Sequence, residues 1–302
     1  MTYGNYCKIL LASAALSLAA CGGGRGGGSL ALIPPPPPPL ASPGASSVDI
    51  FASPASQEFA ALGSGDSLRI RYDAASGLYE VMPGDQGWKK LVDDPNSSPF
   101  AGSPNVNFVF AGGGTSGSYF SIRAHYSYTD PNYKYQYSNL AGWGGLNGGV
   151  QLVGQYVAFG MATPIAAIPV TGAATYTGMI VGTSSEKLDN SGEAISNGYI
   201  TGGINLAFNF GAGTLAGSIS PEVDLSGRRA IGTLAFTDTI YSAGKPGFSG
   251  RFNTNLAGEN AFSGLFTGPN ANELIGRFAF PYTSPFDGTS AQAAGAFIAK
   301  KP

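Results

Sequence analysis

Hydrophobic and polar residues alternate along the C-terminal part of the chain, from residue 248 to residue 300. Phe248, Gly250 and Phe252 occupy every other position, and Phe262 and Phe266 flank Gly264 in the same way. A period of two is typical of a β-strand, in which alternate residues share one face. The opposite face carries serine, arginine, asparagine and threonine, so it is predicted to meet solvent. A glycine beside each phenylalanine leaves room for rings from neighbouring strands.

The same alternation predicts eight strands after residue 164, at residues 173–182, 199–210, 214–220, 230–238, 248–254, 261–268, 274–280 and 294–300. An even number of antiparallel strands can close into an up-and-down barrel, which has no free edge. We expect the inward residues to be Tyr176, Ile180, Leu206, Phe208 or Phe210, Leu215, Ile219, Leu234, Phe236, Phe252, Phe262, Phe266, Phe278, Phe280 and Phe297. So many rings favour a packed interior over a hollow one. A membrane-spanning barrel is disfavoured, because several strands are shorter than the 9 to 11 residues, roughly, that a spanning strand needs.

A β-rich first domain is predicted for residues 48–163. Its expected strands, two of them joined by a turn at 75–77, lie at residues 68–72, 78–82, 106–110, 119–128, 133–137 and 150–159. Residues 59–62 are expected to form a short turn, and no segment has a sustained helical period. The fold class is therefore all-β: a C-terminal eight-stranded antiparallel up-and-down β-barrel, at 164–302, preceded along the chain by a β-rich domain.

The first 47 residues resemble a lipoprotein leader and a tether. Residues 1–20 contain Lys8 and an apolar run that is too short to span a bilayer. They end in Leu-Ala-Ala, and this tripeptide with Cys21 resembles a bacterial lipobox. The resemblance implies that the chain is cleaved before Cys21 and that Cys21 is lipidated, with palmitate among the acyl groups. No aspartate follows Cys21, which by the sorting rule of enteric bacteria favours the outer membrane. Residues 21–47, rich in glycine and then proline, are predicted to be a spacer.

Composition removes several function classes. Lys and Arg number 16 against 18 Asp and Glu, so nothing predicts nucleic-acid binding. Both cysteines, Cys7 and Cys21, lie in the leader region, so the folded part has no disulfide. The single histidine, His125, excludes sites that need two imidazoles, and no metal site or resident cofactor is predicted.

Aromatic residues cluster between residues 126 and 143. The cluster comprises Tyr126, Tyr128, Tyr133, Tyr135, Tyr137 and Trp143. One interpretation is that these rings pack one face of a sheet. The other is a ligand-contact surface, because tyrosine and tryptophan provide rigid contact area with a polar group. His125 or a neighbouring tyrosine could also serve as an axial haem ligand.

Nothing in the sequence predicts an enzyme. No nucleophile-elbow, Ser-x-x-Lys or paired-carboxylate motif stands out. Glu186, Asp189 and Glu193 gather in a hydrophilic segment, which is interpreted as a solvated loop or alternatively as a calcium-like site, although its spacing does not fit an EF-hand.

The chain resembles the transferrin-binding protein B family. The likeness rests on the lipobox, the tether, GAATYTG at 172–178, NLAFNFGAGTLAGSI at 205–219 and, above all, GLFTGPNANELIGRF followed by GAFIAKK. The last of these matches the family pattern at Gly264, Phe266, Gly268, Pro269, Ala271, Glu273, Leu274, Gly276 and Phe278. In that family a handle domain precedes an eight-stranded barrel.

The resemblance implies a non-catalytic outer-membrane lipoprotein, exposed at the cell surface, that binds a partner for nutrient capture. The expected partner is an iron-carrier protein, haem or another nutrient-related ligand, beside a TonB-dependent transporter. The alternative is a structural or assembly lipoprotein of the cell envelope. The chain has room for one handle and barrel, whereas full-length transferrin receptors of this type have two. The matching residues specify the fold, while ligand specificity resides elsewhere.

Overall fold

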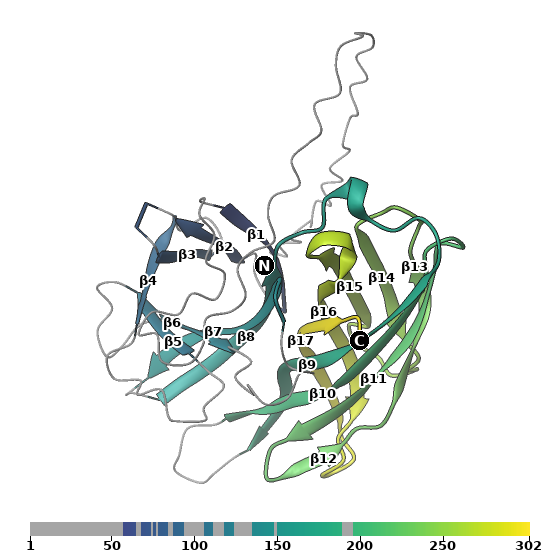
Figure 1. Cartoon of the computed structure of the whole chain (residues 1–302). Helices are drawn as coiled ribbons and strands as arrows, with labels where there is room; N and C mark the ends of the chain where they lie inside the picture. Colours follow the sequence, from purple (N-terminus) through teal and green to yellow (C-terminus); the bar gives the residue numbers. More distant parts are fainter. Residues whose placement is uncertain are drawn as a thin grey trace, which may run out of the picture. The chain divides into compact units, whose positions relative to one another are not determined.

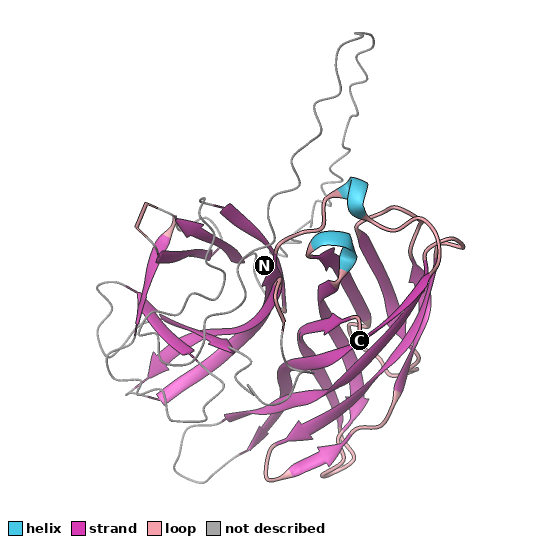
Figure 2. Cartoon of the chain, in the orientation of Figure 1, coloured by secondary structure: helices cyan, strands magenta, loops and turns pink. Residues whose placement is uncertain are grey.

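The structure is a computed structural model of the chain. It describes residues 57–64, 68–73, 75–76, 78–83, 87–93, 106–110, 118–123, 135–147, 150–188 and 196–302. The predicted leader and tether, with Cys21, lie outside these residues, as do His125, Tyr126, Tyr128 and Tyr133. All described residues belong to one compact unit, and all of its extended elements are β-strands (Figures 1 and 2).

The first domain, which we call the handle, is a sheet of eight antiparallel strands that closes on itself. The strands are β1 (Gln57–Gly63), β2 (Leu68–Asp73), β3 (Leu78–Pro83), β4 (Lys89–Asp93), β5 (Val106–Phe110), β6 (Ser118–Arg123), β7 (Ser138–Asn147) and β8 (Val150–Gly160). Each strand pairs with the next, and β1 closes the ring by pairing with β2 through its first half and with β8 through its second half. The core inside the ring consists of Phe59, Ile70, Tyr79, Val81, Leu91, Ala141, Val157 and Phe159.

Two sequence predictions in the handle are wrong. Residues 59–62 belong to strand β1, where Phe59 is buried against Tyr79 and Phe159. Residues 135–137 precede a strand instead of forming one, and β7 begins at Ser138. Strand β7 contains Gly142, Gly144 and Gly145, and glycine is a poor strand former. Pairing with β6 on one side and β8 on the other holds β7 in the extended conformation that its own sequence does not favour.

The C-terminal domain confirms the predicted eight-stranded barrel. Its strands are β9 (Ala173–Leu188), β10 (Ser196–Asn209), β11 (Thr214–Asp224), β13 (Leu234–Ile240), β14 (Gly247–Phe252), β15 (Ala261–Thr267), β16 (Glu273–Thr283) and β17 (Ser290–Lys300). They pair in the order β10-β9-β17-β16-β15-β14-β13-β11, and the pairing of β10 with β11 closes the ring. A short strand that the sequence pattern did not predict, β12 (Arg228–Ala230), pairs with the end of β11.

Aromatic rings fill the barrel, as the alternation predicts. Every predicted inward residue belongs to one core, with Leu234 and Phe236 partly buried against it. Phe208 lies near its centre, with its ring centroid 4.9 Å from that of Phe266 and 5.1 Å from that of Phe248. The glycines leave space for these rings: a Cβ added to Gly264 would lie 2.3 Å from the ring of Phe248, and one on Gly276 would lie 2.0 Å from that of Phe297.

Helical structure among the described residues is limited to two single turns of 3-10 helix. These are η2 (Ile165–Ala167), which follows the handle, and η3 (Pro269–Ala271), which joins β15 to β16. In the part of the chain that the structure describes, no helix has the length and apolar character needed to cross a membrane.

We expect Gly276→Ala to destabilise the barrel by about 1–3 kcal/mol, because the added methyl group overlaps the ring of Phe297 in a packed core. Urea unfolding followed by tryptophan fluorescence and circular dichroism measures the change. The matched control is Gly203→Ala in β10, where an added Cβ would have its nearest neighbour, the carbonyl oxygen of Gly178, at 4.0 Å. The control should change the free energy of unfolding by less than about 0.5 kcal/mol. Equal effects of the two substitutions would contradict the packing role of Gly276.

Candidate functional site

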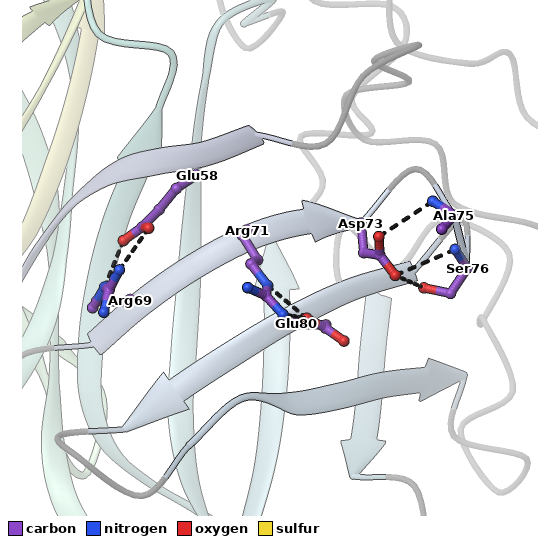
Figure 3. A network of polar contacts seen from close by, with 7 residues as sticks. All are labelled: Glu58, Arg69, Arg71, Asp73, Ala75, Ser76 and Glu80. Carbon is purple, nitrogen blue, oxygen red and sulfur yellow. Dashed lines mark hydrogen bonds and ion pairs between the residues drawn. The ribbon is translucent and has the colours of Figure 1, made fainter.

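The outer face of handle strands β1 to β3 carries a row of charged side chains. Glu58, Arg71 and Glu80 lie directly opposite one another on neighbouring strands. Successive residues of a strand point to opposite faces, so these residues lie on the face opposite Phe59, Ile70 and Val81, which fill the handle core. Figure 3 shows the charged side chains meeting across the strands.

Two ion pairs link this row. The guanidinium of Arg69 donates from Nε and Nη2 to the two carboxylate oxygens of Glu58, at 2.6 and 2.7 Å. Its hydrogen bond lowers the pKa of Glu58. Arg71 Nε donates to Glu80 Oε2 at 2.6 Å, and the Glu80 side chain is only 7% exposed. An exposed pair such as Glu58 with Arg69 stabilises a fold by at most about 1 kcal/mol, so this pair contributes little to stability.

Trp88, just before β4, lies under both arginines. The Cζ atom of Arg71 is 4.1 Å from the centroid of the Trp88 ring, and that of Arg69 is 5.2 Å away. Such contacts are cation–π interactions, and they hold the planes of the arginines in place. We call Glu58, Arg69, Arg71, Glu80 and Trp88 the arginine–tryptophan ladder. Tryptophan and arginine are enriched among the residues that dominate protein–protein binding energy.

A hairpin turn ends the ladder. The carboxylate of Asp73 accepts hydrogen bonds from the backbone N–H groups of Ala75 and Ser76, at 3.2 and 3.3 Å, and from the Ser76 hydroxyl at 2.7 Å (Figure 3). The turn predicted at this position is confirmed. It fixes the β2–β3 register, and thereby the positions of Arg71 and Glu80.

The structure places two of the predicted ligand-contact residues in a buried position. Tyr135 and Tyr137 are 1% and 6% exposed, and the Tyr135 hydroxyl donates to the carbonyl of Ile298 in β17 at 3.5 Å. Burial raises the pKa of Tyr137, and the nearby carboxylate of Glu273 raises it further. These two tyrosines adopt the packing role that the sequence allowed. Trp143 lies in β7, paired with Phe120 of β6.

The handle is attached to the barrel through a buried carboxylate. Glu273, the first residue of β16, accepts hydrogen bonds from the backbone N–H groups of Gln136 at 2.6 Å and Tyr137 at 3.0 Å. Beside it, the hydroxyls of Ser138 and Thr267 are 2.6 Å apart. Because Gln136 and Tyr137 precede β7, they have no partner strand here, and Glu273 satisfies their donors from the other domain.

The segment that connects the two domains pairs with the end of β15. The N–H of Thr163 donates to the carbonyl of Phe266 at 2.9 Å, and the N–H of Gly268 donates to that of Met161 at 2.8 Å. Gly268 has φ 75, a backbone conformation that favours glycine. A Cβ at this position would also lie 2.5 Å from the Tyr137 ring, so a larger residue would clash there. We call these contacts and those of Glu273 the handle clamp.

An apolar layer surrounds the clamp. It contains Tyr135, Leu140, Tyr156 and Ala158 from the handle with Val181, Ile275, Ala296 and Ile298 from the outer face of the barrel. Burial in this layer raises the pKa of Glu273 to about 7, although the hydrogen bonds from Gln136, Tyr137 and Ser138 and the charge of Lys300 favour the ionised form.

On the sequence alone, the hydrophilic segment with Glu186, Asp189 and Glu193 is interpreted as a solvated loop or a calcium-like site. Glu186 lies on β9, where its carboxylate accepts hydrogen bonds from the hydroxyls of Tyr282 and Ser184. Asp189 and Glu193 lie outside the described residues. Among the residues that are described, no three histidine, cysteine, aspartate or glutamate side chains gather closely enough to hold a metal ion.

Sequence reasoning missed the ladder and the clamp. The alternation of Leu68, Arg69, Ile70 and Arg71 already marks two outward arginines, but Trp88 precedes a strand that the pattern did not predict. In the sequence, Glu273 stands out only as one of the positions that match the family pattern. Glu273 is a single acidic residue in an otherwise apolar strand pattern, and this is the signal in the sequence that its side chain is buried and hydrogen-bonded.

We expect the clamp to be pH-dependent. Glu273 has a pKa of about 7 in the fold against an ordinary value of 4.5, so the folded protein binds more protons than the unfolded chain between these values. The stabilisation from the protonated form is complete below about pH 4.5 and is lost as the pH rises through about 7. The free energy of unfolding should fall by something on the order of 3 kcal/mol across this window.

Glu273→Gln tests this expectation, because the amide cannot ionise and, like the protonated acid, keeps one acceptor oxygen. Urea unfolding between pH 4.5 and 8 should show a smaller decline for the variant than for the wild type. Glu259→Gln, which removes a carboxylate from an exposed loop, serves as the control and should follow the wild type. Identical pH profiles for wild type and Glu273→Gln would contradict the shifted pKa.

A comparison with protein families agrees with the barrel architecture. Residues 168–301 match the family model described as C-lobe and N-lobe beta barrels of Tf-binding protein B. A double mutant of transferrin-binding protein B from Haemophilus parasuis Hp5 matches with 16% identity and a TM-score of 0.38, over 85% of this chain and 55% of that chain. The isotype 1 protein from serogroup B Neisseria meningitidis matches with 15% identity and a TM-score of 0.43, over 81% and 43%.

A structure described as a surface lipoprotein matches with 15% identity and a TM-score of 0.37, over 81% of this chain and 98% of that one. The chain spans about half the length of the transferrin-binding protein B structures that it matches. A comparison with curated proteins found no match.

Proposed function

We propose that the chain, whose residues 168–301 match the model of the β-barrels of Tf-binding protein B, is a non-catalytic surface lipoprotein that captures a protein partner through its handle. The proposed partner class is an iron-carrier protein, with transferrin as the first candidate because the similar proteins are named for binding it. Delivery to a TonB-dependent transporter in the same membrane would complete the uptake route.

The observation that carries this proposal is the arginine–tryptophan ladder. Its arginines are fixed by carboxylates and by the Trp88 ring, so a partner meets side chains that have already lost their rotational freedom. Arg69 and Glu58 remain 51% and 42% exposed, and they provide the polar part of a contact surface. The ladder lies on the handle, and the clamp holds the handle to the barrel, so the surface is presented on a rigid support.

The N-terminal prediction supplies the anchor. Lipidation of Cys21 would hold the chain on the outer membrane, and the glycine- and proline-rich tether would separate the handle from the lipid surface. Tyr126, Tyr128, Tyr133 and Trp143 stay predicted contacts, in addition to the ladder. Haem bound through His125 is the proposed alternative ligand, and an assembly role in the envelope is the proposed alternative function.

Trp88→Ala should weaken capture of transferrin by the full-length protein at least about tenfold, because both arginines lose the ring that orients them. Surface plasmon resonance with the immobilised protein measures the affinity, and circular dichroism confirms the fold. Arg228→Ala, on the barrel strand β12, is the control and should bind as the wild type does. Failure of the wild type to bind transferrin, haemoglobin or hemin would refute nutrient capture and favour the assembly role. Full binding by Trp88→Ala would exclude the ladder.

Cys21→Ser should release the protein from the membrane fraction and abolish incorporation of a palmitate analogue, since the thiol that receives the lipid is gone. Cell fractionation followed by labelling measures both. Cys7→Ser, within the predicted leader, should be labelled normally. Labelling that persists in Cys21→Ser would show that Cys21 is not the lipid attachment site.

A further inference from the structure

An open groove of about 420 Å³ lies on the outer face of the barrel, over strands β13 to β17. This volume falls in the range of small-molecule sites, about 300–1,000 Å³. Gly63 and Ser64, at the end of handle strand β1, line its handle side. The groove is separate from the ladder, and the ladder residues are not among those that line it.

Small side chains form the floor of the groove. Ala261, Ala279 and Ala294 make one row across β15, β16 and β17, and Ser249, Ser263 and Arg277 make the adjacent row across β14, β15 and β16. Outward positions of a solvated sheet usually carry larger polar or β-branched residues. Here alanine and serine leave a trough over β15.

Two arginines border the trough from opposite sides. Arg251 stands on β14 and Arg277 on β16, so they lie two inter-strand spacings apart, about 10 Å across the sheet, and are offset by two residues along the strands. The outward residues between them on β15 are Ala261 and Ser263. Both guanidinium groups can therefore extend over β15 toward one ligand with only these two small side chains between them.

Neither arginine is neutralised within the described part of the chain. Arg277 Nε donates to the Ser263 hydroxyl at 3.2 Å, and no ion pair reaches it or Arg251. Three other arginines, Arg69, Arg71 and Arg228, are each paired with a carboxylate. Guanidinium groups bind the oxygens of phosphate and carboxylate through paired hydrogen bonds. The groove therefore offers an oxyanion two guanidinium groups that are not in ion pairs.

Two acidic residues restrict what else the ligand can carry. Glu259 and Asp238 line the same groove. The β13–β14 register shifts between Thr237 and Ile240, and Asp238 adopts φ 48 at this irregularity. Strand irregularities of this kind often redirect a side chain beside a binding site. The two carboxylates repel further negative charge, which disfavours polyanions and favours a compact ligand.

We propose that this groove binds a small molecule that carries one phosphate or carboxylate group and a neutral or cationic remainder. Arg251, Arg277 and the Ser263 hydroxyl bind the oxyanion, the alanine row accommodates the body of the ligand, and Asp238 and Glu259 face its remainder. The site does not depend on capture of a protein partner by the handle.

Isothermal titration of the full-length protein with O-phosphoethanolamine, β-alanine and citrate tests the proposal. We expect saturable one-to-one binding of phosphoethanolamine or β-alanine, and the tighter of the two identifies the oxyanion as phosphate or carboxylate. Citrate, a polyanion, should bind more weakly than either. Tighter binding of citrate would overturn the assigned role of Asp238 and Glu259.

Arg251→Gln and Arg277→Gln should each weaken binding of the preferred probe at least about tenfold, and Ala261→Leu should weaken it by filling the trough without changing the charge. Arg228→Gln has the same loss of charge elsewhere on the barrel and should leave the affinity within about twofold. All variants lie on exposed positions and are checked by circular dichroism. The absence of saturable binding by the wild type, or equal losses in Arg228→Gln, would overturn the proposal.

Discussion

The arrangement of the molecule depends on one buried carboxylate. Glu273 begins a barrel strand, yet its two oxygens accept hydrogen bonds from the backbone of the handle at Gln136 and Tyr137. A buried carboxylate is costly unless hydrogen bonds compensate it, and unpaired buried N–H groups are costly as well. Each domain therefore holds a group that only the other can satisfy. This mutual dependence makes the handle and the barrel one compact unit.

The segment around Glu273 has two structural roles in a short stretch of sequence. Gly264 and Gly276 make space for the rings of Phe248 and Phe297 in the barrel core. Between them, Gly268 bends the chain against Tyr137, and Ala271 accepts a hydrogen bond from the buried Tyr176 hydroxyl at 2.6 Å. The stretch whose glycines make room for rings in the barrel core thus also joins the two domains. The ladder lies outside this stretch, on β1 to β4, whereas the groove over β13 to β17 includes Arg277 at its end.

Alternation of apolar and polar residues was enough to predict the barrel, because each of its strands has a buried face with large side chains. Phe252, Phe262 and Phe280 could be assigned to the interior for this reason. The same approach failed for β7, whose glycines carry no pattern, and for β4, whose KKLVD sequence is too short to show one. The ladder, the clamp and the groove each join side chains from different strands. Arg71 and Trp88, or Glu273 and Gln136, come together only through the strand pairing and the domain packing, which local sequence does not encode.

Hydrogen exchange at the backbone amides of Gln136 and Tyr137, in wild type and in Glu273→Ala, tests the central claim most directly. If the carboxylate holds the handle, these two amides should lose at least about a hundredfold in protection in the variant, while amides of Phe278 and Phe297 in the barrel core stay protected. Unchanged protection of Gln136 and Tyr137 would contradict the account. Loss of protection throughout the barrel would contradict it as well, since Glu273 would then support the barrel itself and not its link to the handle.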